Sequence, residues 1–241
     1  MNYIFDLYGT LADIRTDETK KEFWQGVAEF YRNHGADYTP AKLKASYKRL
    51  VKDEIEKRHA EIPEVEKRFI EPELRNVFRR LYEEKETEAK TSSDLIDETA
   101  LCFRELSREY IRLYPHVKEV LEALRNEGHG LYLLSNAQAV FTMPELEQLG
   151  IADIFDGIII SSDVGVKKPS TGIFGILMER YHLRPKDCVM VGNDQHDDIL
   201  SAHAAGLRSI YIESEISSPA VKPFPEDCRQ VGSIKELISG Q

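Results

Sequence analysis

The stretch Asn2-Tyr3-Ile4-Phe5-Asp6-Leu7-Tyr8-Gly9-Thr10 joins a short apolar run to an acid and a glycine turn. Short, fully apolar strands that alternate with helices are typical of a parallel sheet covered on both faces. The sequence therefore predicts an α/β fold in which residues 2–5 form one strand. A helical segment is followed by a similar apolar run at four later places, namely 131–134, 158–160, 188–191 and 209–212.

Residues 17–110 differ in composition and pattern: they are rich in Glu, Lys and Arg, and their apolar residues recur three and four positions apart. This spacing indicates amphipathic helices. We therefore predict a Rossmann-like core made of residues 1–15 and 111–241, with an all-helical cap domain, residues 16–110, inserted after the first strand. One apolar group that shows the spacing consists of Phe23, Val27, Phe30 and Tyr31.

The charge balance of the chain bears on its partners. The 241 residues include 42 acidic and 32 basic side chains, which gives a net charge of −10. Nucleic acids and anionic membranes both need a positive protein surface, so we expect neither as a partner. A small anionic substrate needs only a local positive site, and it remains compatible with this balance.

The cysteines and the apolar runs bear on location. Cys102, Cys188 and Cys228 show neither paired nor metal-ligand spacing, which fits a reducing compartment. No run approaches the ~18 apolar residues of a membrane span, and the first residues do not resemble a signal peptide. We expect a cytoplasmic protein that is a monomer or a weak dimer.

Polar residues follow the predicted strands at the points where each strand ends. Ligands of open parallel sheets bind beyond the carboxyl ends of the strands. Each of these residues alone is commonly a turn residue or a helix cap. Their joint position at one edge predicts a site. The residues are Asp6 and Thr10 after the first strand, Ser135 and Asn136 after the second, Lys168 after the third, and Asn193, Asp194, Asp197 and Asp198 after the fourth.

Four stretches of the sequence resemble the four motifs of the haloacid dehalogenase superfamily. They are Phe-Asp-Leu-Tyr-Gly-Thr-Leu-Ala-Asp at 5–13, Leu-Leu-Ser-Asn at 133–136, Val-Lys-Lys-Pro at 166–169 and Val-Gly-Asn-Asp-Gln-His-Asp-Asp-Ile at 191–199. The resemblance covers the predicted core, and the helical insertion lies where this superfamily carries a C1-type cap. It implies a hydrolase.

The resemblance also implies a chemistry. Asp6 would be the nucleophile that attacks the phosphorus of a small phosphorylated metabolite and forms an aspartyl-phosphate. Lys168 would hold Asp6 and the phosphoryl oxygens as a point charge. Ser135 would bond a phosphoryl oxygen, and Asp197 or Asp198 would orient Lys168 or a metal-bound water. The implied substrate contacts are Thr10, Asn136 and Tyr8.

The implied cofactor is Mg²⁺, which would screen the phosphate and the carboxylate from each other. Its expected ligands are the Asp6 carboxylate, the backbone carbonyl of Tyr8, and a side-chain oxygen from Asn193 or Asp194. The superfamily usually has an acid directly after the glycine of its fourth motif, where this chain has Asn193. The sequence leaves open whether Asn193, Asp194 or both contact the ion.

Tyr8 is a second departure from the pattern, because the superfamily's phosphatases usually carry an Asp two residues after the nucleophile as general acid and base. A phenol with a pKa near ~10 is a poor base at neutral pH. We therefore expect slow turnover, or a preference for good leaving groups such as those of acyl or aryl phosphates.

Two alternatives remain. The Asp-x-Tyr-Gly-Thr form also resembles the 2-haloacid dehalogenases, which use the same Asp without a metal. The acidic fourth motif and the absence of a Trp-Arg-x-Lys-Gln segment early in the cap favour phosphoryl chemistry instead. The second alternative is a degenerate protein that binds a phosphorylated ligand without turnover. The sequence of the cap does not reveal the substrate.

Overall fold

The computed structural model describes residues 1–85, 91–221 and 223–238. Its main sheet has six parallel strands in the order β5-β4-β1-β6-β7-β8, so the predicted α/β class is confirmed. The strands are β1 (Asn2–Phe5), β4 (Gly130–Ser135), β5 (Gly157–Ile160), β6 (Cys188–Gly192), β7 (Arg208–Ile212) and β8 (Cys228–Val231). No apolar run in the sequence indicates β8.

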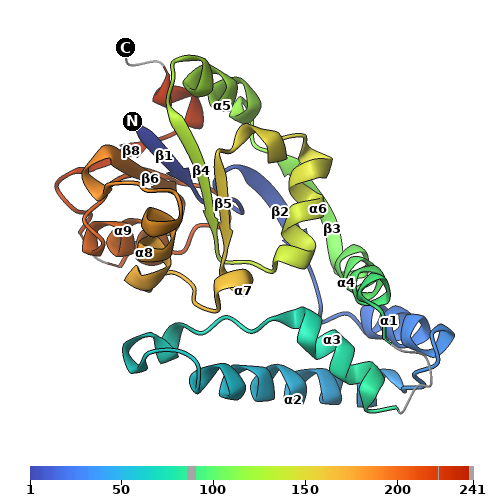
Figure 1. Cartoon of the computed structure of the whole chain (residues 1–241). Coiled ribbons are helices and arrows are strands. Elements are labelled where there is room, and N and C mark those ends of the chain that lie inside the picture. The colour runs from blue at the N-terminus through green and yellow to red at the C-terminus, as the bar shows by residue number, and fades with distance from the viewer. Residues whose placement is uncertain (86–90, 222, 239–241) are drawn as a thin grey trace.

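Helices cover both faces of this sheet (Figure 1). One face packs against α5 (Val117–Asn126), α6 (Ala139–Leu149) and the 3-10 helix η5 (Ile234–Leu237). The other face packs against α8 (Thr171–Arg180) and α9 (Ser201–Ala204). Neighbouring residues of a strand point to opposite faces, and both faces are buried, which explains why the central strands β1, β4 and β6 are mainly apolar.

The register of the central strands decides where the polar residues meet. Phe5 of β1 lies beside Leu133 of β4 and beside Val191 of β6. The backbone N–H of Asp6 then donates to the carbonyl of Val191 at 2.9 Å. The carboxyl ends of these three strands therefore lie at one edge of the sheet.

A layer of helices lies beyond that edge (Figure 1). This helical layer has its own apolar core, which also takes in Val140 and Phe141 of α6. The ring of Phe141 stacks 6.1 Å from the ring of Phe103 in the layer. The core helix α6 is thus shared between the two parts. The layer consists of α1 (Lys21–Asn33), α2 (Pro40–His59), the 3-10 helix η1 (Glu64–Phe69), α3 (Leu74–Glu83) and α4 (Ser93–Ser107).

A two-stranded antiparallel sheet joins the helical layer to the main sheet and differs from the helices expected in this part of the chain. We expected helices throughout residues 17–110, but β3 (Arg108–Leu113) begins inside this range and pairs antiparallel with β2 (Ala12–Thr16). The insertion therefore follows a second, separate strand. The pairing joins residues almost a hundred positions apart, which local periodicity cannot reveal.

The proposed division at residues 15/16 and 110/111 falls within this two-stranded sheet, and it stays a proposal.

Among the helices that the structure describes, none is long and apolar enough to cross a membrane.

Candidate active site

Asp6 follows the central strand β1, and only 8% of its surface is exposed. One carboxylate oxygen, Oδ1, accepts a hydrogen bond from Lys168 Nζ at 2.8 Å. The other, Oδ2, lies 3.3 Å from the hydroxyl of Thr10. The carboxylate is therefore fixed at one oxygen and more loosely held at the other.

Lys168 is the centre of a buried charge cluster. Its Nζ donates to Asp6 Oδ1, to Asp198 Oδ1 at 2.6 Å and to the carbonyl of Leu134 at 2.9 Å. These three bonds use all three ammonium protons. Burial alone would lower the pKa of Lys168, but the charges of Asp198 and Asp6 raise it above its ordinary value. Lys168 therefore stays protonated at neutral pH.

Asp198 is the partner that the sequence left undecided. Besides Lys168 it accepts a hydrogen bond at Oδ2 from the backbone N–H of Asp194, at 2.9 Å. Burial raises the pKa of Asp198 to about 6; the charge of Lys168 acts against this rise and the charge of Asp6 adds to it. One lysine between two carboxylates leaves one negative charge uncompensated when both acids are ionised. A buried net charge is costly, so this cluster favours a further cation.

The loop after β1 packs against Asn193. Gly9 has a φ of +93°, and a Cβ at this position would lie 2.5 Å from Asn193 Nδ2, so the approach requires glycine. Asn193 Nδ2 donates to the hydroxyls of Ser214 and Ser217, each at 3.3 Å. Its Oδ1 consequently faces Thr10, whose hydroxyl lies 3.1 Å away. The amide oxygen and Asp6 Oδ2 thus converge on one hydroxyl.

The neighbouring acids have other contacts. Asp194 caps the π-helix η4 (Gln195–Leu200), accepting at Oδ1 from the backbone N–H groups of His196 and Asp197, both at 2.8 Å. Asp197 Oδ2 accepts from Asn136 Nδ2 at 3.2 Å. These contacts favour Asn193 over Asp194 as the side chain that faces Asp6.

Ser135 and Asn136 end β4 beside Asp6. The hydroxyl of Ser135 is buried and makes no hydrogen bond within the described part of the chain, so it is free for a ligand oxygen. The Asn136 amide bonds the backbone of Lys168 in both directions, at 2.8 and 2.9 Å. Asn136 therefore holds the lysine loop in place, and its predicted substrate contact stays a prediction.

Tyr8 points its hydroxyl at α6. The hydroxyl donates to Glu145 Oε2 at 2.5 Å and lies 3.0 Å from Thr142 Oγ1. Arg104 and Arg108 both bond the Glu145 carboxylate, at 2.7 Å each. Burial and the adjacent Glu145 raise the pKa of Tyr8 above its ordinary value. The phenol is therefore protonated throughout the neutral range.

Sequence reasoning missed this network. A Glu and two Arg on predicted helices are ordinarily exposed. Only the folded structure places Glu145 in a buried position beside Tyr8.

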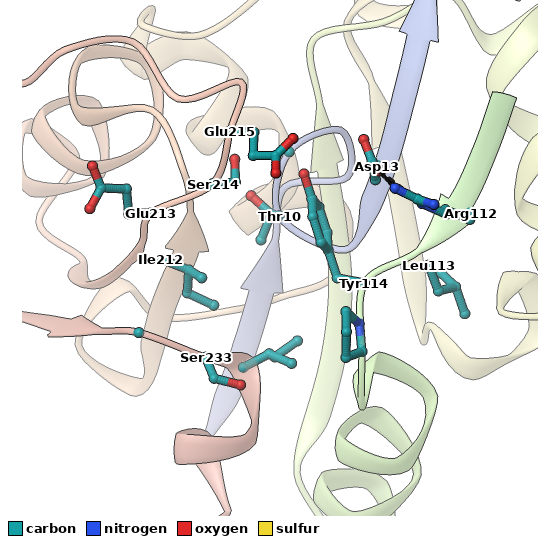
Figure 2. A pocket seen from close by; sticks show the side chains of 14 residues that line it. Thr10, Asp13, Arg112, Leu113, Tyr114, Ile212, Glu213, Ser214, Glu215 and Ser233 are labelled. Atoms are coloured by element: carbon teal, nitrogen blue, oxygen red, sulfur yellow. Dashed lines mark hydrogen bonds and ion pairs between the residues drawn. The ribbon is translucent and has the colours of Figure 1, made fainter. Parts of the chain in front are cut away.

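A cavity of about 620 Å³ opens beside Thr10, next to the sheet of β2 and β3. Figure 2 shows the paired side chains of Asp13 and Arg112 in its lining, with Tyr114 between this pair and Ser214. Arg112 Nη2 lies 2.7 Å from Asp13 Oδ2. The cavity shares Gly9 and Thr10 with the site but not Asp6. Its lining consists of Gly9, Thr10, Asp13, Arg112, Leu113, Tyr114, Pro115, Ile212, Glu213, Ser214, Glu215, Gly232, Ser233 and Ile234.

The residues present fit a small hard cation. Within the ranges described, no three His, Cys, Asp or Glu side chains cluster in a way that could hold a metal. The predicted set is instead the Asp6 carboxylate, the carbonyl of Tyr8, and a side-chain oxygen from Asn193 or Asp194, of which the contacts above favour Asn193. Oxygen ligands of this kind suit Mg²⁺, which usually keeps several waters. The uncompensated charge at Asp6 and Asp198 adds to the fit.

Proteins of known function are similar to parts of this chain. A glyceraldehyde 3-phosphate phosphatase of Methanothermobacter thermautotrophicus is 35% identical over 107 residues, covering 44% of this chain and 47% of that protein. A phosphoglycolate phosphatase of Vibrio vulnificus is 36% identical over 124 residues, covering 48% and 54%. The chain thus spans about half the length of these curated relatives.

Solved structures share the fold over nearly the whole chain. A 2-haloacid dehalogenase from Pseudomonas syringae pv. Tomato is similar with a TM-score of 0.67 and 22% identity, covering 98% of this chain and 96% of that one. A haloacid dehalogenase-type phosphatase from Thermococcus onnurineus gives 0.58 and 19%, covering 99% and 96%. At these identities the likeness shows the fold alone.

The family model for haloacid dehalogenase-like hydrolases matches residues 2–206. This range includes the sheet strands β1 to β6 and all four motifs. The protein is therefore a member of the haloacid dehalogenase-like hydrolase family.

Proposed function

We propose that the protein hydrolyses a small phosphorylated metabolite, with Asp6 as the nucleophile and Mg²⁺ as cofactor. The observation that carries the proposal is the buried cluster of Asp6, Lys168 and Asp198. Lys168 fixes one oxygen of Asp6 at 2.8 Å, while the cluster as a whole retains a negative charge. An arrangement of this kind holds a carboxylate ready for attack and accommodates a further cation.

Hydrolysis then takes two displacements. An oxygen of Asp6 forms a bond to phosphorus while the bond from phosphorus to the leaving oxygen breaks. Water next attacks the phosphorus of the aspartyl-phosphate, which releases phosphate and restores Asp6. Bound Mg²⁺ supplies positive charge that lets two anions approach.

The other groups of the site have supporting roles in this scheme. Asn193 and the carbonyl of Tyr8 complete the cation ligands with Asp6. The free hydroxyl of Ser135 and that of Thr10 bond phosphoryl oxygens, and Lys168 offsets the charge on the reacting groups.

The Tyr8 contacts limit the substrates. Its hydroxyl is bonded to Glu145, and its raised pKa makes it a weak acid. The leaving oxygen therefore departs without a proton from this position, which favours acyl or aryl phosphates over alkyl phosphates. The curated relatives are named as phosphatases of small phosphorylated compounds, which supports a substrate of that size.

The test is a panel of acyl, aryl and alkyl phosphates and 2-haloacids, assayed with and without Mg²⁺. We expect phosphate release that needs Mg²⁺ and that Asp6→Asn abolishes. Chloride release from 2-chloropropionate without metal would instead identify a dehalogenase. Tight binding of a phosphorylated compound without turnover would identify a degenerate binding protein.

A further inference from the structure

The helical layer touches two of the loops that carry candidate catalytic groups. Residues 69–74, here called the seam segment, run from the last residue of η1 to the first residue of α3. They lie against residues 165–170, the lysine loop. Ile70 and Val166 form an antiparallel bridge between the two.

Two backbone hydrogen bonds hold this bridge. The N–H of Lys167 donates to the carbonyl of Phe69, and the N–H of Glu71 donates to the carbonyl of Gly165, both at 2.9 Å. An ion pair between Lys167 and Glu71, at 3.7 Å, lies beside them. The residue next to Lys168 is thus fastened to the helical layer through its own backbone.

Gln138 binds the second loop, residues 135–138 from the end of β4 to the start of α6, to the seam segment. This residue follows Ser135 and Asn136, directly before α6, and its side chain is buried. Its Oε1 accepts from the backbone N–H of Leu74 at 2.9 Å. Its Nε2 donates to Glu71 Oε1 at 2.7 Å and to the carbonyl of Pro72 at 2.8 Å. One buried amide therefore joins the seam segment at three points.

The two loops are also bonded to each other. Asn136 bonds the Lys168 backbone in both directions. Ser161, which precedes the lysine loop, adds hydrogen bonds to the backbone of Ala137. Movement of the seam segment away from the core would therefore release both loops together. The three bonds of Lys168 Nζ depend on where its loop lies.

We propose that Gln138 and Glu71 are positioning residues that make the alignment of Lys168 conditional on a docked helical layer. With the layer docked, the lysine loop is held and Nζ reaches Asp6. With the layer displaced, the lysine loop loses its two backbone bonds to the seam segment and keeps those to Asn136, so Lys168 is held less tightly. The site would then be assembled only in the docked state.

Hydrogen exchange of the whole protein tests this coupling without any substrate. We expect Gln138→Ala to speed amide exchange at least about tenfold in both the seam segment and the lysine loop, leaving β1 and β6 protected. Faster exchange in the seam segment alone would overturn the proposal. Faster exchange across the whole sheet would also overturn it, because it would mean general destabilisation.

Kinetics give a second readout, which rests on the proposed function. With an acyl phosphate as probe, Gln138→Ala should lower kcat by about 100-fold and change KM far less, since a misplaced catalytic group costs rate. The double variant Q138E/E71Q exchanges the carboxylate and the amide, and it should recover part of the rate. The matched control is Gln230→Ala, an exposed glutamine on β8, which should leave kcat unchanged.

An unchanged kcat in Gln138→Ala would contradict the coupling. Absence of turnover in the unaltered protein would instead remove the proposed function, while the exchange experiment would still decide the coupling.

Discussion

At the scale of the residue, Lys168 is unusual because only 1% of its surface is exposed and it lies between two carboxylates. Replacing it with Met would leave Asp6 and Asp198 buried and facing each other without a cation. We expect Lys168→Met to lower the free energy of unfolding by about 3–5 kcal/mol and to abolish turnover. Urea unfolding at neutral pH measures the first effect and phosphate release the second.

The control for this variant is Lys52→Met on α2, where 77% of the side chain is exposed. Surface substitutions of this kind change the free energy of unfolding by no more than about 0.5 kcal/mol. Equal stability losses in the two variants would contradict the importance of the buried cluster.

Tyr8 carries the second prediction at this scale. Tyr8→Asp introduces a carboxyl group where a general acid would act on the leaving oxygen. General acid–base catalysis contributes about 10²–10⁴-fold, so we expect kcat on alkyl phosphates to rise by at least about 10²-fold. The rise on acyl phosphates should be much smaller, because their leaving groups need no proton.

Tyr8→Phe is the matched control, since it removes the hydroxyl without adding an acid. It should bring no gain on alkyl phosphates. If Tyr8→Asp also brings none, the explanation of the slow leaving-group step is wrong.

At the scale of the element, Glu145 joins three pieces of structure. It lies on α6 and bonds Arg104 of α4, Arg108 of β3 and Tyr8 of the loop after β1. Burial alone would raise the pKa of Glu145, but the hydrogen bonds and charge of Arg104, with the bonds from Tyr8 and Arg108, lower it. The ionised carboxylate is thus the form that the fold stabilises.

A lowered pKa has a definite consequence for stability. Glu145 contributes stability above its unfolded pKa of about 4.3, and this contribution is lost as the pH falls through the lower folded pKa. We expect Glu145→Gln to lower the free energy of unfolding at pH 7 by about 1.5–3 kcal/mol. The difference from the unaltered protein should shrink below about pH 4, as urea unfolding at several pH values would show.

Glu147→Gln is the control, because Glu147 is an exposed residue of the same helix. It should have little effect at either pH. A loss in Glu145→Gln that is the same at pH 7 and pH 3 would show that ionisation of Glu145 does not stabilise the fold.

At the scale of the whole molecule, the proposed binding of a cation between Asp6 and Asn193 would link the metal to folding. A ligand that binds only the folded state stabilises it by about 2.7 kcal/mol at a concentration 100 times its Kd. We expect Mg²⁺ to raise the Tm in a concentration-dependent way, and a chelator to reverse the rise. Calorimetry without any substrate measures this.

Asn193→Ala should weaken this magnesium effect, whereas Asn126→Ala should retain it, because Asn126 is exposed at the end of α5. An equal rise of the Tm in both variants would place the ion elsewhere.

Much of the fold could be predicted from sequence because most strands of the main sheet have a local sequence signal. Each buried parallel strand is a short apolar run next to a helix, so 2–5 and 188–191 were visible in the pattern. The pairing of β2 with β3 was not visible, because these strands are polar in part and the whole helical layer lies between them in the sequence. Strand β8 was missed because it reads Cys-Arg-Gln-Val, with two exposed polar residues at an edge of the sheet.

The sequence by itself determined the order of polar residues after the strands, and therefore which residues meet at one edge. It could do so because parallel strands place all their carboxyl ends on the same side. The choice of Asp198 as the partner of Lys168, the seam that Gln138 forms with the helical layer and the burial of Glu145 beside Tyr8 were decided only by the tertiary structure. These contacts depend on distances between elements far apart in the chain, and no local pattern encodes such distances.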